Sequence, residues 1–374
     1  LELRLEKIFP SWSDFFCLPF RDHLKYFPMK NKSIEFCGKT LGAGQPAFIV
    51  AEVGFNHNGD VELAKKMIQS ASENGADAVK LQTFIAQEMI TKSLVADDPD
   101  NPGSEIPFFE FFQRYELSRS DYEVLFAYAK SLNISLFSTP FDEASLKMLV
   151  ELGVPAIKIA SPDLTFLPFL EKVGKTGLPV VLSTGMGNEE EISQALEILQ
   201  PKCSVILLHC VSNYPSQYEE MNLKCMEALQ SKFNVPLGLS DHTIDNLSAV
   251  VAASMGAVLV EKHFTIDQKL PGVDQSISMQ PQDLRKLKEE LVNVNQILGD
   301  GKKRIQPSEI PVKQSARRSL VARMDISAGT VLTKEMIACK RPGKGIPPSE
   351  LEAIIGKSCK KDIQAEQVID WEMF

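Results

Sequence analysis

The chain has 374 residues, of which 44% are hydrophobic and 24% are charged, as expected for a packed globular protein larger than one small domain. Its 40 Lys and Arg against 49 Asp and Glu give a net charge of −9, which argues against a nucleic-acid-binding surface. A locally basic pocket for an anionic small molecule is still allowed. The longest apolar stretch, residues 249–260, is too short to cross a bilayer, so no membrane partner is expected.

Residues 1–28 lack the basic start, apolar run and cleavage site of a signal peptide. We expect them to be an extension peripheral to the fold, arising from start-site choice, and we assign residues 1–45 to this extension and a lead-in. Seven cysteines without a Cys-x-x-Cys pair indicate reduced thiols and a cytoplasmic protein.

From residue 46 onward, apolar runs alternate with helical patterns, which indicates a parallel sheet with both faces covered. Eight runs are predicted as strands: 48–53, 78–82, 135–138, 156–160, 180–183, 205–208, 237–240 and 258–262. Helical patterns cover 61–74, 120–132, 143–152, 189–199 and 246–255, and Gly75, Gly153 and Gly256 are predicted to end three of them. Eight βα units in about 250 residues fit a TIM barrel better than a doubly wound sheet. The predicted fold class is therefore α/β, with a (β/α)8 barrel over residues 46–298.

The pattern changes after residue 298. Residues 299–316 are rich in Gly, Pro and charged side chains and are predicted to form an extended linker. Residues 317–374 show short β-like runs separated by turns, which predict a small β-rich module that is marginal on its own.

Polar side chains stand at the end of every predicted strand, where the catalytic residues of a TIM barrel lie. His242 and His263 end neighbouring strands and can converge on one point. Imidazole binds divalent Mn, Fe, Co or Zn, but two hydrogen-bonded histidines in a polar barrel mouth would give the same pattern. The residues alone leave both interpretations open.

Lys80 and Lys158 lie within strands that helices are predicted to cover, where an outward-facing lysine would be buried at a large free-energy cost. Pointing into the barrel, they could form an anion site or a Schiff base. Hydroxyl side chains end four strands and, with both lysines, are typical of a phosphate or carboxylate cradle: Thr139, Ser161, Ser183 and Ser240. No G-x-G-x-x-G or Walker sequence occurs, so ATP and NAD are not expected.

Eight ordered segments contain these strand ends: 51–59 (AEVGFNHNG), 79–82 (VKLQ), 138–141 (STPF), 158–161 (KIAS), 182–186 (LSTGM), 209–215 (HCVSNYP), 238–243 (GLSDHT) and 261–265 (EKHFT). In this order they resemble the sialic acid synthase family, the phosphoenolpyruvate-dependent nonulosonate synthases. The tail, with residues 316–322 and Lys340-Arg341-Pro342-Gly343, resembles the antifreeze-like (SAF) domain of the same family.

The resemblance implies a transferase in which C3 of phosphoenolpyruvate attacks the aldehyde of an open-chain N-acylated hexosamine, water adds at C2 and phosphate leaves. It implies catalytic roles for Glu52, His242 and His263, with both histidines binding a divalent metal, Mn²⁺ or alternatively Mg²⁺ or Co²⁺. The implied phosphoenolpyruvate ligands are Lys80, Thr139, Lys158, Ser161, Ser183, Ser212 and Ser240, and the implied sugar ligands are Gln82, Asp163, Tyr214, Asp274 and Arg341. Arg341 would come from the partner protomer of a domain-swapped homodimer.

Two positions depart from the best-known neuraminate synthases, which carry Gly-Glu in place of Pro162-Asp163 and Asn in place of Ser212. The sugar is therefore left open between N-acetylmannosamine and a 2,4-diacetamido-trideoxyhexose, giving neuraminate, legionaminate or pseudaminate for surface polysaccharides. A Schiff-base aldolase or lyase on a keto-acid sugar, using Lys80 or Lys158, and a catalytically inactive sugar-binding homologue are the alternatives.

Overall fold

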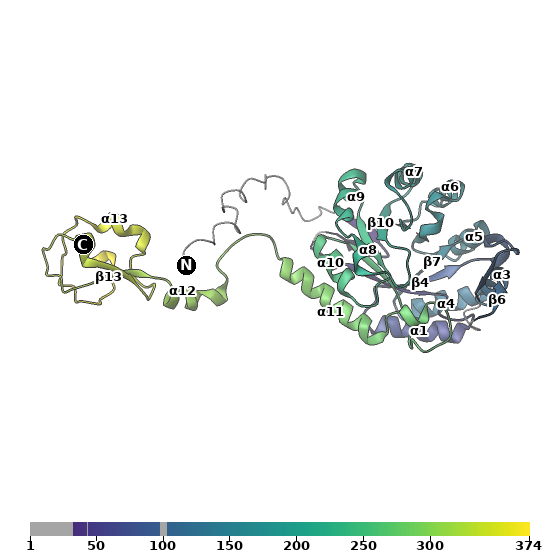
Figure 1. Cartoon of the computed structure of the whole chain (residues 1–374), viewed down its shortest axis with the longest axis horizontal. Coiled ribbons are helices and arrows are strands. Elements are labelled where there is room, and N and C mark those ends of the chain that lie inside the picture. Colours follow the sequence, from purple (N-terminus) through teal and green to yellow (C-terminus); the bar gives the residue numbers. More distant parts are fainter. Residues whose placement is uncertain (1–32, 43, 98–102) are drawn as a thin grey trace, which may run out of the picture. The chain divides into compact units, whose positions relative to one another are not determined.

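The structure is a computed structural model that describes residues 33–42, 44–97 and 103–374. It contains two compact units, the first ending at Gly299 and the second covering Asp300–Phe374 (Figure 1). The predicted peripheral extension of residues 1–28 lies outside the described residues.

Eight parallel strands close into a barrel in the first unit, which confirms the predicted fold. In order around the barrel they are β3 (Phe48–Gly54), β4 (Ala78–Thr83), β7 (Ser135–Pro140), β8 (Ile157–Ile159), β9 (Val180–Ser183), β10 (Val205–Cys210), β11 (Leu237–Asp241) and β12 (Leu259–His263). Pairing of β12 with β3 closes the ring. The strands are buried on both faces because helices cover the outside, which explains their continuous apolar runs.

Helices surround the strands, as Figure 1 shows. They are α1 (Val61–Glu73), α4 (Arg119–Ser131), α5 (Glu143–Glu151), α6 (Leu167–Lys175), α7 (Glu189–Leu199), α9 (Cys225–Phe233), α10 (Leu247–Met255) and α11 (Pro281–Leu298), with the short α2 (Ala86–Met89), α3 (Phe108–Gln113) and α8 (Tyr218–Met221). Local sequence fixes their ends: the Asp60 side chain accepts hydrogen bonds from two amides at the start of α1, and Gly256, with φ +108°, ends α10 as predicted. In the described part of the chain, no helix is long and apolar enough to span a membrane.

A hairpin before the barrel covers the amino-terminal end of its strands. Its strands β1 (Ile34–Phe36) and β2 (Lys39–Leu41) pair antiparallel. The Phe36 ring packs 5.3 Å from the Phe48 ring and 5.8 Å from the Phe137 ring, measured between centroids. These residues, which the sequence suggested were only a lead-in, therefore belong to the packing of the barrel. Strands of three residues are too short to give a recognisable pattern.

An insertion between β4 and β7 packs on the opposite, carboxyl-terminal end. It contains β5 (Val95–Asp97), β6 (Glu105–Pro107), α2 and α3. Its Phe111 and Tyr115 cluster with Phe55 and Phe84, which directly follow β3 and β4. This aromatic cluster holds the long loop against the end of the barrel that carries the polar strand ends.

The second unit has its own small core, which includes Leu320, Ile337 and Ile354. Strands β13 (Ser319–Ala322) and β14 (Ile337–Lys340) pair antiparallel, and α13 (Leu351–Ile354) is a single turn. The extended linker predicted for 299–316 is wrong in its second half, because a 3-10 turn at Pro307–Glu309 leads into α12 (Ile310–Ala316). Pro307 and Pro311 each stand in the first turn of a helix, where proline favours helix formation instead of interrupting it.

Candidate active site

A pocket opens at the carboxyl ends of the barrel strands. The lining includes most of the residues predicted from sequence: Glu52, Lys80, Gln82, Thr139, Lys158, Ser161, Ser183, Tyr214, Ser240, His242 and His263. Glu261 and Cys210 also line it, although neither was assigned a role from sequence. Alternation along the strands explains the convergence, because Lys80 and Gln82, like Glu261 and His263, are separated by one residue that points outward.

Lys80 is a buried cation held by two carboxylates. Its Nζ lies 2.9 Å from Glu52 Oε1 and 3.6 Å from Glu261 Oε1, and it donates a 3.0 Å hydrogen bond to Thr139 Oγ1. Burial alone would lower the pKa of Lys80, but the Glu261 and Glu52 carboxylates raise it overall. Lys80 therefore remains a charged ammonium group at neutral pH.

Lys158 is less fully compensated. Its Nζ donates hydrogen bonds to Ser183 Oγ at 2.6 Å and to the Ile159 carbonyl oxygen at 3.0 Å, and lies 3.7 Å from Glu261 Oε1. Burial lowers the pKa of Lys158, and the nearby Lys80 charge lowers it further, against the opposing effect of Glu261. An anion bound between the two lysines would oppose this effect and favour the charged form of Lys158.

Two carboxylates complete the charged floor of the pocket. Burial raises the pKa of Glu261, but the charges of Lys158 and Lys80 lower it overall, so this carboxylate is ionised. The Oε2 atoms of Glu52 and Glu261 are buried without a hydrogen-bond partner, while Glu52 Oε1 accepts a 2.9 Å hydrogen bond from Gln82 Nε2. The two unpartnered oxygens can bind a ligand hydroxyl or water, or act as a general base. Glu261 could have been assigned to the pocket from sequence, because it lies two residues before His263 on the same strand and therefore points to the same side.

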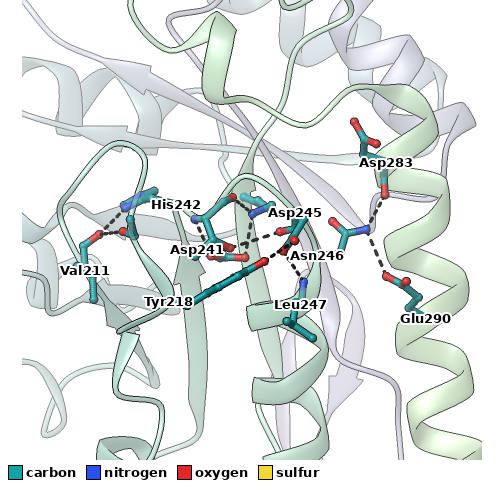
Figure 2. Close-up of polar contacts among 12 residues, drawn as sticks. Val211, Tyr218, Asp241, His242, Asp245, Asn246, Leu247, Asp283 and Glu290 are labelled. Atoms are coloured by element: carbon teal, nitrogen blue, oxygen red, sulfur yellow. Dashed lines mark hydrogen bonds and ion pairs between the residues drawn. The ribbon is translucent and has the colours of Figure 1, made fainter. Parts of the chain in front are cut away.

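The rings of His242 and His263 lie 5.6 Å apart between centroids. His242 Nδ1 is 2.7 Å from the Val211 carbonyl oxygen (Figure 2), so it carries the hydrogen and Nε2 keeps its lone pair in the neutral ring. His263 Nδ1 lies 3.7 Å from Asp274 Oδ2 and has no hydrogen-bond partner. Burial is the main cause that lowers the pKa of His263 and keeps its ring neutral.

These two imidazoles fit a divalent ion, because neutral ring nitrogens bind such ions and the pocket around them contains unpartnered buried polar atoms. No cluster of three or more His, Cys, Asp or Glu suited to a metal occurs among the residues that the structure describes. An ion held here would therefore take its other ligands from substrate and water, as catalytic metal sites with open positions do.

Cys210 lies beside His242 and the serines of the pocket. Burial lowers the pKa of His242 and raises that of Cys210, but the hydrogen bond between the two side chains reverses both directions. A divalent ion that binds His242 would have to displace the proton shared in the hydrogen bond between His242 and Cys210, so metal binding should release protons.

Gly185 lets two predicted ligands of phosphoenolpyruvate come together. A β-carbon at this position would lie 2.2 Å from Ser212 Oγ, 2.8 Å from Ser161 Oγ and 3.2 Å from Cys210 Sγ. The Gly185 amide donates a 2.9 Å hydrogen bond to Ser161 Oγ. Ser212 does not line the pocket itself, but its hydroxyl lies beside this glycine, next to that of Ser161.

Three predicted sugar ligands do not line the pocket: Asp163, Asp274 and Arg341. Asp274 lies beside His263, as described above, and Arg341 is exposed directly after β14 in the second unit. Asp163 is half-buried in the turn that follows β8, and its Oδ2 has no hydrogen-bond partner. Burial raises the pKa of Asp163 to about 6, with Lys158 acting in the opposite direction.

Asp163→Asn is expected to stabilise the protein at pH 7.5 by about 1–2 kcal/mol, because the folded state disfavours the ionised carboxylate. The pKa of Asp163 is higher in the folded chain than in the unfolded chain. The contribution of the wild-type residue to the stability against unfolding is therefore complete below about pH 4. It is lost as the pH rises through about 6. Urea unfolding at pH 4 and 7.5 measures this, and an equal difference at both values would contradict it.

Comparisons with known proteins agree with this geometry. A model described as the NeuB family matches residues 67–303, and a model of the SAF domain matches residues 317–374. The chain belongs to the NeuB family. It is 38% identical over 342 residues to the N,N'-diacetyllegionaminic acid synthase of Legionella pneumophila, covering 89% of this chain and 96% of the relative.

Other relatives of this NeuB-family chain act in the synthesis of neuraminic acids. The N-acetylneuraminate-9-phosphate synthase of Mus musculus is 33% identical over 341 residues, covering 90% of this chain and 95% of the relative. The solved N-acetylneuraminic acid synthetase of Leptospira borgpetersenii superposes with a TM-score of 0.69 and 35% identity, covering 75% of this chain and 95% of that one. The family expected from the strand-end motifs and the SAF domain expected from the tail are thus confirmed.

Proposed function

We propose that this protein condenses phosphoenolpyruvate with an open-chain N-acylated hexosamine and water, giving a nine-carbon nonulosonic acid and phosphate. The observation that carries the proposal is the pair of buried lysines, Lys80 and Lys158, surrounded by strand-end hydroxyls in one pocket. Such a cradle suits a small molecule that carries both a phosphate and a carboxylate. The synthase names of the relatives support the same class of reaction.

In the proposed reaction, the C2–C3 double-bond electrons of phosphoenolpyruvate form a bond to the aldehyde carbon, whose oxygen takes up a proton. Water adds at C2 and loses a proton, and the C2–O bond to phosphate breaks. Lys80 and Lys158 neutralise the anionic groups, while Thr139, Ser183 and Ser161 orient them.

Glu52 is assigned to the aldehyde sugar, because its unpartnered oxygen lies in the same pocket as the lysines. A divalent ion on His242 and His263, for which we propose Mn²⁺ with Mg²⁺ or Co²⁺ as alternatives, would supply Lewis-acid polarisation of the aldehyde. The Tyr214 ring packs 4.1 Å from the His242 ring between centroids and helps to fix the imidazole orientation.

The proposed sugar is a 2,4-diacetamido-trideoxyhexose, with N-acetylmannosamine as the second candidate. Support comes from the higher identity to the legionaminic acid synthase, 38%, than to the neuraminate-9-phosphate synthase, 33%. Gln82, Asp163, Tyr214 and Asp274 are the residues that we propose contact this sugar.

The proposed function is tested by measuring phosphate release with phosphoenolpyruvate and a panel of N-acylated hexoses. Release should require both substrates and should be fastest with the 2,4-diacetamido sugar. Mass spectrometry of the product distinguishes condensation from hydrolysis of phosphoenolpyruvate alone, which would contradict the proposal. Borohydride in the presence of a keto acid should leave the protein unlabelled, whereas labelling of Lys158 would favour a Schiff-base aldolase.

We further propose a domain-swapped homodimer in the cytoplasm. Residues 300–374 carry 14 Lys and Arg against 10 Asp and Glu, whereas residues 1–299 carry 26 against 39, so the two units have opposite net charge. This complementarity supports docking of one protomer's tail on its partner's barrel. Every cysteine in the described ranges is free, which suits a reducing compartment.

Arg341→Ala is expected to raise the KM for the sugar about tenfold and to leave the KM for phosphoenolpyruvate nearly unchanged, because only the N-acyl group loses a partner. Steady-state kinetics with each substrate varied in turn measures the split. Truncation after Ile297 should remove activity, and a fully active barrel alone would exclude any role of Arg341.

A further inference from the structure

A buried ion pair lies in the barrel wall beside the two candidate metal-binding histidines. Lys262 Nζ on β12 is 2.9 Å from Asp241 Oδ2 on β11, and the side chains are only 2% and 0% exposed. These residues are direct partners in the parallel ladder. Their strand neighbours Ser240 and Glu261 line the pocket, so Asp241 and Lys262 point to the opposite face, toward the helices.

Neither charge takes part in the chemistry proposed above, and a buried ion pair contributes little net stability because both groups lose their hydration. Its place in the sequence suggests another role. Asp241 directly precedes His242, and Lys262 directly precedes His263. The ion pair therefore joins the two backbone segments that carry the imidazoles.

Thr243 joins the same contacts on the other side of His242. Asp241 Oδ1 accepts hydrogen bonds from the Thr243 amide at 2.9 Å and from Thr243 Oγ1 at 2.8 Å. Lys262 Nζ also donates to the Thr243 carbonyl oxygen. Both neighbours of His242 are thus fixed to the residue before His263.

The remainder of the loop after β11 is fixed to the surrounding helices (Figure 2). Asp245 accepts hydrogen bonds from Tyr218 Oη of α8 and from the Leu247 amide. Asn246 Nδ2 donates to the Asp283 carbonyl oxygen at 3.0 Å and to Glu290 Oε2 at 3.3 Å, both on α11. The loop is therefore held at both ends, with the ion pair at the end nearest the pocket.

We propose that the Lys262–Asp241 ion pair positions His242 relative to His263 and thereby sets the affinity of the two imidazoles for a divalent ion. Both residues are positioning residues, since neither lines the pocket. This role rests on the metal role in the proposed function. It explains why a costly pair of charges is buried at this place in the wall.

The decisive variant is the double substitution Lys262→Met and Asp241→Asn. It removes both charges together, so no unpaired charge stays buried, and the amide oxygen of Asn can still accept from Thr243. We expect Mn²⁺ alone to bind at least about tenfold more weakly than to the wild type, as loss of supporting contacts around metal ligands does. Free Mn²⁺ is measured by electron paramagnetic resonance, and thermal unfolding verifies the fold. If the double variant does not fold, Asp241→Glu, which keeps both charges but changes the length of the ion pair, is measured in the same way, and a loss of Mn²⁺ affinity is again expected.

Lys288→Met is the matched control. Lys288 of α11 forms an ion pair with Asp77 at 3.0 Å. Asp77 directly precedes β4, so this ion pair lies at the end of the barrel away from the pocket. This variant should bind Mn²⁺ like the wild type. Affinity of the double variant within twofold of the wild type would overturn the positioning role, as would an equal loss in Lys288→Met.

A wild-type protein that binds no Mn²⁺ would instead contradict the metal in the proposed function. The positioning role then depends on a crystal structure of the metal-free double variant. A changed separation of the His242 and His263 rings from 5.6 Å would support it, and an unchanged separation would overturn it.

Discussion

His263→Ala is expected to lower phosphate release by about 10²–10³-fold and to abolish detectable Mn²⁺ binding. In the described residues the candidate site offers only two imidazole ligands, so the loss of one leaves a single protein nitrogen. EDTA should cause a comparable loss in the wild type, and added Mn²⁺ should restore the wild type but not the variant. The measurements are phosphate release after chelation and titration of the protein with Mn²⁺.

His209→Ala provides the matched control for this substitution. His209 is in β10, which β11 separates from β12. Its Nε2 lies 2.7 Å from the Met221 carbonyl oxygen, and the side chain does not line the pocket. This variant should keep its Mn²⁺ affinity and most of its activity. Full activity of His263→Ala in metal-free buffer would remove the metal from the proposed reaction.

Lys80→Met is expected to lower kcat/KM for phosphoenolpyruvate by about 10²–10³-fold and to destabilise the barrel by about 3–5 kcal/mol. Lys80 compensates two buried carboxylates, and its loss leaves Glu52 without its ion-pair partner and Glu261 with Lys158 alone. Guanidinium unfolding measures the stability, and steady-state kinetics measures the catalytic loss.

Lys158→Met separates these two effects. It should impair the use of phosphoenolpyruvate to a similar extent, because the anion loses one of two cations. The destabilisation should be smaller, about 1–2 kcal/mol, since Glu261 keeps Lys80 as a partner. Equal destabilisation by both substitutions would show that Lys80 is not the main counter-charge of the carboxylates. An unchanged KM for phosphoenolpyruvate in both variants would remove the lysines from the proposed cradle.

The barrel and much of its pocket could be predicted because strand ends in this fold meet by geometry. Lys80 and Lys158 were informative for a physical reason, since a lysine in a doubly covered strand has few places to point except the pocket. Glu261 was visible in the same pattern, but its role depends on distances to both lysines that a sequence does not contain. The contact of Cys210 with His242 likewise joins the end of β10 to the loop after β11 and appears only in three dimensions.

Short or locally ambiguous segments were harder to predict. The three-residue strands of the hairpin at 34–41 are too short to show periodicity, although Phe36 is fully packed under the barrel. Proline in residues 305–315 suggested an extended chain, but in the first turn of a helix it has the opposite effect.

The charged floor of the pocket also restricts how such an enzyme can change. Replacing any one of Lys80, Lys158, Glu52 and Glu261 by a neutral residue alters the balance among four buried charges, so a new floor requires compensating substitutions through a less stable intermediate. Tyr214, which is 51% exposed, and the exposed Pro162 stand at the rim and carry no such penalty. If the proposed function holds, variants of this chain that accept other sugars should therefore arise first by substitution at the rim, with the proposed phosphoenolpyruvate cradle retained.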